Sequence, residues 1–327
     1  MGNPRTSRFT AIVTALVLAA IVVVLPLRCA WREAPGEVTL GVSALRISLP
    51  VFVAQEQGIF ARHGLRVTLR TYPTAQPMID DVALGRVDAA GFAAWPIILL
   101  ASERATEPLR VTTSLVEDDA HRLSYVLARR GSGLRFPADA PGRRVGVLPT
   151  VAYRKWLPAI VRAAGLDPAT VTVVPVEPAL QAQSLAQGGV DMLFTNDPMA
   201  TAMIARGVAE VIDDGPPCAR RLGAPFRFGS FVLSGSFARR APELAARVER
   251  ALDEAILATR RDSVAARVAM ARYLRPEERP FVDRYPPSRY LTSAEAGEAL
   301  REEVASERAL GILDRDVKVA RFQRSER

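Results

Sequence analysis

The chain has 327 residues, of which 49% are hydrophobic and 24% charged, so it has an ordinary globular composition and room for two domains of typical size. Its formal net charge of +8 comes almost wholly from arginines that are scattered singly or in pairs, without a basic block interleaved with aromatics. We therefore interpret the charge as a solvated basic surface and expect no nucleic-acid partner. Two cysteines and two histidines provide neither a disulfide framework nor a zinc site, so we expect no metal and no cofactor.

Residues 1–37 are predicted to be a signal or anchor segment followed by a linker. Arg5 and Arg8 precede an uncharged, mostly apolar run at 10–27, which is typical of an export signal or signal anchor. No small-x-small cleavage site follows this run, so we favour an uncleaved helix that tethers the protein to the membrane. Lipid attachment at Cys29 is the alternative. Either arrangement predicts an extracytoplasmic, periplasmic location.

From residue 38 onward, hydrophobic periodicity and the positions of Gly and Pro predict alternating strands and helices. In the first half we expect strands at 38–42, 65–72, 87–91, 109–116 and 124–130, and helices at 50–57, 76–84 and 95–104. In the second half we expect strands at 143–148, 170–176, 190–195 and 209–213, and helices at 151–164, 179–187 and 198–206. A polar loop at 215–225 then leads into a strand at 226–233, which returns to the first half. A long amphipathic helix at 242–260 and a charged helical tail follow.

Two stretches about a hundred residues apart share one plan. Residues 84–89 read Leu-Gly-Arg-Val-Asp-Ala, and residues 187–192 read Gln-Gly-Gly-Val-Asp-Met. Each follows a helix-like run opened by a proline, Pro77 or Pro178, and each leads into a short apolar strand. Two copies of a strand–helix–strand plan indicate an α/β protein with two similar lobes and a cleft between them.

We expect each lobe to be a mostly parallel sheet flanked by helices. The Gly-Ser-Gly sequence at 131–133, followed by further Pro and Gly residues, marks the boundary between the lobes. The predicted organisation is lobe I at 38–128, lobe II at 129–227, and a return strand with C-terminal helices at 228–327.

Several motifs occur together and in order. Pro50, Ala54, Gly58 and Phe60 fit the spacing P-x-x-x-A-x-x-x-G-x-F, a Gly-Leu-Arg-Val turn follows, and residues 84–89 supply a Gly-x-x-Asp-Ala phrase. From about residue 38 to 256 the chain thus resembles the periplasmic substrate-binding proteins of ABC importers, in the branch that includes taurine, alkanesulfonate, nitrate and thiamine-pyrimidine binders. The resemblance implies the type II periplasmic binding fold, two lobes joined by two hinge strands, and a receptor that docks on an ABC permease in the inner membrane.

In open α/β sheets, ligands lie beyond the carboxyl ends of strands, where helix N-termini point unpaired N–H groups at the cleft. Polar and aromatic residues at such ends are our candidates for ligand binding: Ser43, Leu45, Ser48, Thr74, Gln76 and Trp95 in the first half, and Thr150, Tyr153, Asn196 and Asp197 in the second. Other roles stay open for some of them. Thr150 and Asp197 would also serve as helix N-caps, and Trp95 and Tyr153 would also pack in the core.

The sequence therefore predicts a monomeric receptor that captures a small solute by hinged closure of its lobes. Polar helix ends suit a sulfonate-like or nitrate-like anion, whereas Tyr153 and Trp95 suit a planar heterocycle, and we favour the anion slightly. No motif for a catalytic nucleophile is present in the sequence, so we expect no enzymatic activity. The alternatives are an enzyme of thiamine or menaquinone metabolism on the same fold, and a sensory ligand-binding domain.

Overall fold

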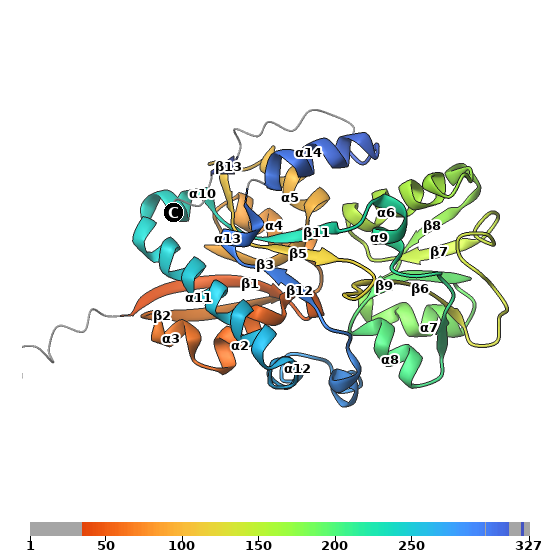
Figure 1. Ribbon diagram of the computed structural model, residues 1–327, viewed down its shortest axis with the longest axis horizontal. Helices are drawn as coiled ribbons and strands as arrows, with labels where there is room; N and C mark the ends of the chain where they lie inside the picture. Colours follow the sequence, from red (N-terminus) through yellow and green to blue (C-terminus); the bar gives the residue numbers. More distant parts are fainter. Residues whose placement is uncertain (1–34, 298, 314–321, 324–327) are drawn as a thin grey trace, which may run out of the picture. The chain divides into compact units, whose positions relative to one another are not determined.

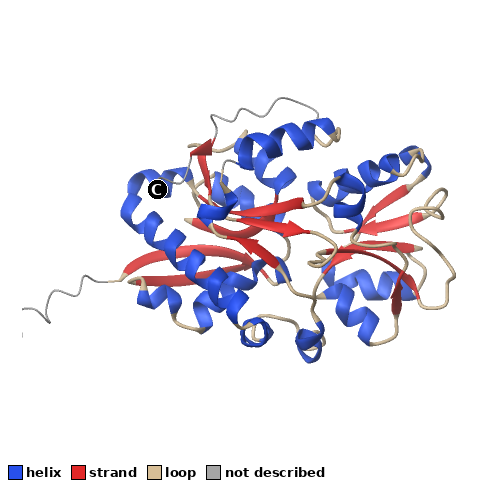
Figure 2. Ribbon diagram, in the orientation of Figure 1, coloured by secondary structure: helices blue, strands red, loops and turns tan. Residues whose placement is uncertain are grey.

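The computed structural model describes residues 35–297, 299–313 and 322–323. From Glu37 onward the chain forms one compact unit. This unit is built on two β-sheets, each with helices packed on both faces (Figures 1 and 2).

The larger sheet contains eight strands among the described residues: β1 (Gly36–Ser43), β2 (Leu65–Tyr72), β3 (Ala89–Ala94), β4 (Leu109–Val111), β5 (Ser114–Glu117), β11 (Phe226–Leu233), β12 (Arg289–Leu291) and β13 (Phe322–Gln323). Their order is β12-β5-β11-β3-β1-β2, and β4 pairs with β11 and β13. The associated helices are η1 (Arg46–Ser48), α2 (Leu49–Glu56), α3 (Ile59–Arg62), α4 (Ala75–Ala83), α5 (Trp95–Ser102), α10 (Gly235–Arg240), α11 (Pro242–Arg261), α12 (Ser263–Ala271), η4 (Arg279–Arg284), α13 (Ser293–Ala296) and α14 (Ala299–Ala309).

The smaller sheet contains β6 (Ser124–Arg129), β7 (Arg144–Val147), β8 (Thr172–Pro175), β9 (Met192–Asn196) and β10 (Ala209–Val211), in the order β10-β6-β9-β7-β8. Its helices are α6 (Val151–Ala163), η2 (Pro168–Thr170), η3 (Pro178–Leu180), α7 (Gln181–Ala186), α8 (Met199–Ala205) and α9 (Pro217–Leu222). Helices α6 and α9 cover one face of this sheet, and α7 and α8 cover the other (Figure 1).

The predicted α/β fold class is confirmed, but the sheets are mixed rather than mostly parallel. Strand β11 runs antiparallel to β3, β4 and β5, and β6 runs antiparallel to β9 and β10. These strands carry the chain from one sheet to the other, so they enter each sheet in the opposite direction to the strands of its βαβ units. For the same reason β6, which we expected to end the first half, belongs to the smaller sheet.

Two local predictions also need correction. The single strand expected at 109–116 is two strands, β4 and β5, which pair with different parts of β11. The loop expected at 215–225 contains helix α9, which begins with Pro217 at its first position and buries Cys218 and Leu222. Proline is well suited to a first helical turn, so the residues interpreted as a loop signal instead start a helix.

The repeated phrases identified in the sequence have the same structural role in both sheets. After α4 and α7 the chain turns through glycines with left-handed backbone, Gly85 (φ 70°) and Gly188 (φ 72°). Three residues later an aspartate accepts a hydrogen bond from the neighbouring parallel strand. The Thr39 N–H donates to Asp88 at 2.9 Å, and the Arg144 N–H donates to Asp191 at 2.8 Å. Asp88 therefore fixes the register between β1 and β3, and Asp191 fixes the register between β7 and β9.

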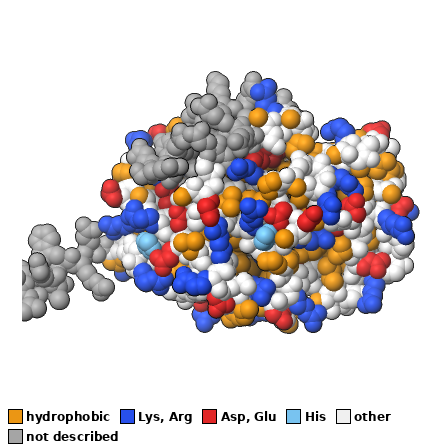
Figure 3. Space-filling model, in the orientation of Figure 1, with side chains coloured by type: hydrophobic (Ala, Val, Ile, Leu, Met, Phe, Trp, Pro, Cys, Tyr) orange, Lys and Arg blue, Asp and Glu red, His pale blue; other side chains and the backbone are white. Residues whose placement is uncertain are grey.

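Within the described part of the chain, no helix combines the length and apolar character that a membrane span requires. The predicted anchor at 10–27 lies outside the described residues. On the face drawn in Figure 3, basic and acidic side chains are interspersed rather than gathered into a block of one sign.

Candidate functional site

The carboxyl ends of two pairs of parallel strands face each other where the two sheets meet. Strands β1 and β3 are parallel neighbours in the larger sheet, and β7 and β9 are parallel neighbours in the smaller one. The Arg46 N–H, just after β1, donates to the Asp197 carbonyl, just after β9, at 3.1 Å. Helix α5, which follows β3, packs against α6, which follows β7. Helix N-termini from both sheets therefore meet at one junction, which is the geometry in which α/β proteins bind ligands.

Six of the predicted binding residues bring a buried polar atom to this junction that has no hydrogen-bond partner in the described chain. They are Ser43 (Oγ), Ser48 (Oγ), Trp95 (Nε1), Thr150 (Oγ1), Tyr153 (hydroxyl) and Asn196 (Oδ1). Each of these residues is at most 4% exposed. Leaving one buried polar group unpaired costs about 1–3 kcal/mol, so such a group calls for a specific explanation. We call these six the junction polar groups.

The alternative roles considered for Thr150 and Tyr153 can be compared with their contacts. Thr150 occupies the N-cap position of α6, but its hydroxyl makes no capping hydrogen bond. The Tyr153 ring packs against Phe194 and Trp156, with centroid separations of 4.8 and 5.5 Å. Burial raises the pKa of Tyr153 well above its ordinary value, and the nearby Cys218 adds to the increase. The ring is therefore part of the core, and the hydroxyl at its end lies beside the Asn196 side chain, which partly offsets the rise of its pKa.

The other predicted residues lie around the junction in different environments. Thr74 is the buried N-cap residue of α4 and makes no capping bond with its side chain, while Gln76 in the same helix is half-buried. Leu45 lines a cleft of about 260 Å³ between the end of β2 and the segment after β8. In each sheet the strand beside this cleft, β2 or β8, is the edge strand next to β1 or β7. The cleft is therefore displaced by one strand from the junction polar groups, towards the edges of the two sheets. We call it the mouth cleft.

Asp197 forms a buried ion pair with Arg46, a residue that the sequence analysis did not single out. The Arg46 Nε lies 2.9 Å from the Asp197 Oδ2, and the two side chains are 2% and 0% exposed. Arg46 also donates to the Pro286 carbonyl at 3.0 Å, to the Ser288 hydroxyl at 2.6 Å and to the Arg122 carbonyl. Burial alone would lower the pKa of Arg46, but the charge of Asp197 raises it above the ordinary value. Both terminal nitrogens of the guanidinium are thus hydrogen-bonded to protein groups, while Nε lies in the ion pair with Asp197.

Asp197 also fulfils part of the expected capping role. Its Oδ1 accepts from the Thr201 backbone N–H at 3.1 Å and from the Thr201 hydroxyl at 2.6 Å, although α8 begins after Pro198. The Tyr125 hydroxyl donates to Oδ2 at 3.2 Å. Asp197 therefore joins the larger sheet, β6 and α8, and it is not a free charge at the junction.

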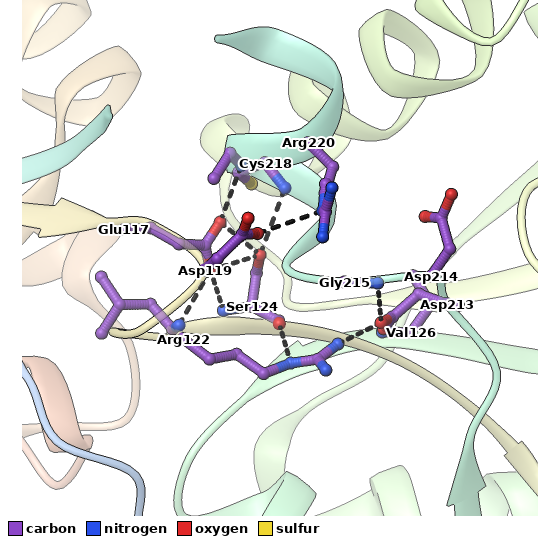
Figure 4. A network of polar contacts seen from close by, with 12 residues as sticks. Glu117, Asp119, Arg122, Ser124, Val126, Asp213, Asp214, Gly215, Cys218 and Arg220 are labelled. Carbon is purple, nitrogen blue, oxygen red and sulfur yellow. Dashed lines mark hydrogen bonds and ion pairs between the residues drawn. The ribbon is translucent and has the colours of Figure 1, made fainter. Parts of the chain in front are cut away.

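A second buried carboxylate lies where the chain crosses between the sheets (Figure 4). Glu117, at the end of β5, accepts from the Leu123 N–H at 2.8 Å, from the Ala219 N–H at 3.0 Å and from both the N–H and the hydroxyl of Ser124. Burial raises the pKa of Glu117, and these hydrogen bonds only partly offset that effect. Burial also raises the pKa of the Cys218 thiol well above its usual value. Glu117 thereby connects both crossings, one between β5 and β6 and the other leading from α9 into β11.

Arg122 connects this crossing network to the Arg46–Asp197 pair. Its guanidinium pairs with Asp213, whose carboxylate also accepts from the Val126 N–H at 2.7 Å (Figure 4). The backbone carbonyl of Arg122 accepts a hydrogen bond from the Arg46 guanidinium. A continuous set of polar contacts therefore runs from the crossings to the junction.

Two sheets whose facing strand ends hold buried hydrogen-bonding groups define the fold class of the two-lobed periplasmic binding proteins. Comparison with known families agrees with this class. Residues 47–263 match the family model described as NMT1/THI5 like, and the chain belongs to that family. The resemblance seen in the sequence motifs is thereby confirmed.

Solved structures share the fold. The alkanesulfonate-binding protein SsuA from Xanthomonas axonopodis pv. citri, bound to MOPS, superposes with a TM-score of 0.70 at 21% identity, over 90% of this chain and 100% of that one. The periplasmic nitrate-binding protein NrtA from Synechocystis PCC 6803 gives a TM-score of 0.65 at 15% identity, over 86% of this chain and 83% of that one. These likenesses establish the fold.

A relative among characterised proteins is the nitrate import ATP-binding protein NrtC from Synechococcus elongatus. The two are 27% identical over 180 residues, which is 50% of this chain. The match covers 27% of the relative, so the chain corresponds to about a quarter of that longer protein.

Proposed function

We propose that this chain is the solute receptor of an ABC-type importer, and that it captures a small solute between its two lobes. The observation that carries the proposal is the set of six unpaired, buried polar atoms at the facing strand ends. Three of them come from segments of the larger sheet and three from segments of the smaller sheet. A solute that bonds to groups of both sheets would offset the cost of burying them unpaired.

The chemistry of the junction polar groups favours a solute rich in hydrogen-bond acceptors. Five of the six atoms can donate, namely four hydroxyls and one indole N–H, and only the amide oxygen is restricted to accepting. The N-termini of α2, α5 and α6 add positive potential at the same place. An oxyanion such as a sulfonate, nitrate or carboxylate meets both conditions. The Tyr153 ring packs in the core, which makes stacking on a planar heterocycle the second choice.

Binding would act by closing the lobes. A ligand shifts a conformational equilibrium only through its stronger affinity for one state, and contacts to both lobes exist only when they are closed. The crossings around Glu117 are the places where the chain would bend, and the Arg46–Asp197 pair already joins the two sheets in this conformation. The sequence predicted lobe I at 38–128 with the return segment at 228–327, and lobe II at 129–227. Because β6 (Ser124–Arg129) pairs with β9, we assign it to lobe II, so lobe II becomes 124–227 and the first part of lobe I becomes 38–123.

The closed receptor would then dock on a membrane permease outside the cytoplasm, as a monomer tethered by its N-terminal segment. We propose binding without chemistry. The cysteine within the described residues, Cys218, is buried and its pKa is raised, so the nucleophilic thiolate is disfavoured.

Titration calorimetry with nitrate, short alkanesulfonates, carboxylates and planar heterocycles tests this proposal. The Thr150→Val variant removes one junction hydroxyl, and we expect it to weaken binding by about 10-fold or more, since a hydrogen bond to a charged group is worth about 1.5–3 kcal/mol. Thr172→Val, an exposed position on β8, is the matched control and should bind like the wild type. Absence of binding to every class, or equal affinity of wild type and Thr150→Val, would contradict the proposal.

A further inference from the structure

A buried carboxyl group, that of Glu307, lies at a second place where the two lobes meet. Helix α14, which carries it, lies in the chain between β12 and β13 and packs against α5, so it belongs to lobe I (Figure 1). The carboxyl lies beside the indole of Trp156, on α6 of lobe II. Just beyond the end of α14, Gly311 lies beside the guanidinium of Arg162, which is also on α6. The C-terminal end of α14 therefore contacts both lobes.

The Glu307 carboxyl makes no well-formed hydrogen bond. The residue is 1% exposed, and neither of its oxygens has a hydrogen-bond partner within the described part of the chain. The neighbouring Trp156 N–H is also left without a well-formed hydrogen bond. A buried carboxylate that lacks hydrogen bonds is costly, so this environment favours the neutral carboxylic acid.

The charges on α14 itself favour the neutral form of Glu307 further. Glu303, one turn earlier on the same face of the helix, is 4% exposed, and like charges at this spacing repel each other. Glu307 also lies in the last turn of α14, where the negative end of the helix dipole opposes an anion. Burial and Glu303 together hold the pKa of Glu307 well above its ordinary value.

The other helices around Glu307 differ in the groups that they bring to it. Helix α5 carries no charged residue from Trp95 to Ser102. From α9, the neutral thiol of Cys218 lies close enough to be affected by the Glu307 charge. Helix α6 brings the Trp156 indole, and of its bases Lys155 is half-buried while Arg154 and Arg162 are exposed. The largest effects on the carboxyl come from burial, Glu303 and Trp156.

We propose that Glu307 couples closure of the lobes to the uptake of a proton, because its carboxyl is neutral while it is buried between α14 and α6 and ionises when the lobes separate. The carboxyl is 1% exposed in this conformation, so a movement of α6 away from α14 brings water to it. This inference rests on the proposed function and adds that solute capture is regulated by pH.

The direction of the pH effect follows from linkage. In the open protein the solvated carboxyl would titrate near 4.5, whereas in the closed protein its pKa is raised. Solute stabilises the closed form, so binding takes up the proton that only the closed form holds. The affinity should be highest at low pH and fall, by up to about tenfold per pH unit, as the pH rises from about 4.5 through the raised pKa.

Titration calorimetry of the full chain with nitrate and with methanesulfonate tests the inference. Repeating each titration at about pH 6 in buffers of different ionisation enthalpy gives the number of protons taken up. We expect the wild type to take up as much as one proton more per bound solute than Glu307→Gln, and to lose affinity more steeply with rising pH. Glu307→Met should behave like Glu307→Gln. Glu243→Gln, at an exposed position on α11, is the control and should follow the wild type.

A second measurement needs no solute. Hydrogen exchange of the backbone amides of α6 and α14, corrected for the intrinsic effect of pH, reports how often the two helices separate. In the wild type we expect less protection at about pH 8 than at about pH 5, whereas Glu307→Gln should be equally protected at both. Other buried carboxylates, such as Glu117, are the same in both proteins and cancel in this comparison.

The outcomes separate this inference from the proposed function. If a probe binds and the wild type and both Glu307 variants take up the same number of protons, the inference is overturned while the receptor proposal stands. If neither probe binds, the proposal of an oxyanion solute is contradicted, and hydrogen exchange decides the inference. A loss of protection at high pH in the wild type alone would then support it, and equal pH dependence in the wild type and Glu307→Gln would overturn it.

Discussion

Replacing Asp197 by asparagine should strongly destabilise the protein. The substitution keeps the shape of the side chain and an oxygen for Thr201, but it leaves the Arg46 guanidinium without its counter-charge. The two side chains are 2% and 0% exposed, so water does not screen the lost interaction. Removing one partner of a buried ion pair costs about 3–5 kcal/mol, and the retained Thr201 contacts place this variant at about 3 kcal/mol.

A double-mutant cycle measures the interaction itself. The free energy of unfolding would be determined by urea denaturation for the wild type, Arg46→Met, Asp197→Asn and the double variant. We expect the double variant to lose clearly less than the sum of the two single losses, with a coupling of about 2–3 kcal/mol. As a control, Glu37→Gln breaks a pair with Arg66 whose side chains are 78% and 67% exposed, and it should change stability by no more than about 1 kcal/mol. Single losses below about 1 kcal/mol that add without coupling would refute this account of the junction.

Three further predictions follow from individual side chains. Glu117→Gln should lower the free energy of unfolding by about 1–3 kcal/mol, because the amide N–H₂ of the glutamine would face backbone N–H donors. The folded-state pKa of Glu117 is raised above 4.5, so the unfolded chain loses this proton at a lower pH than the folded protein does. The wild type should therefore lose stability relative to the variant as the pH rises from about 4.5 through the raised pKa. Parallel pH profiles of the two proteins in urea denaturation would contradict this. The pKa of Glu295 is lowered to about 2 by Arg260, so its stabilising effect should be present above pH 4.5 and disappear as the pH falls towards 2, and thermal unfolding of Glu295→Gln should lack that part of the acid dependence. Tyr153→Phe removes a hydroxyl that makes no well-formed hydrogen bond, so it should leave the free protein about as stable as the wild type while weakening solute binding. Tyr72→Phe breaks a 2.5 Å hydrogen bond to a buried carboxylate and should destabilise the protein, as urea denaturation would show.

The parts of the fold that depend on local pattern were predictable from the sequence. Strand 65–72 and strand 226–233 are found with the predicted bounds, and most helices lie within two residues of their expected ends. The repeated Gly–Asp phrases could be recognised because each performs a complete local task, which is to end a helix and fix a parallel neighbour. Local rules were sufficient where the governing contacts lie within one βαβ unit.

Features set by distant segments were not predictable in this way. The direction of β11 depends on partners more than a hundred residues earlier in the chain, so no local pattern indicates that the sheets are mixed. Strand β12 lies in the C-terminal tail, which we expected to be wholly helical, and it joins the larger sheet beside β5. Short strands with such remote partners carry little periodicity of their own.

In the candidate site too, the features set by local sequence were predictable and those set by distant residues were not. The rule that ligands lie beyond strand ends identified the junction polar groups, because strand ends can be located from the sequence. It could not show that Asp197 is already occupied by Arg46. An arginine between Leu45 and Ile47 in an apolar segment was the available signal, but arginine is almost never fully buried unless it is paired, and its partner lies 151 positions further along the chain.

A crystal structure of the complete protein with a bound alkanesulfonate would test the central claim most directly. We predict that the sulfonate oxygens lie within 3.2 Å, the usual hydrogen-bond limit, of at least one group from each sheet, such as Ser48 on one side and Thr150 on the other. A sulfonate held by one sheet alone, or one bound away from the facing strand ends, would contradict the account.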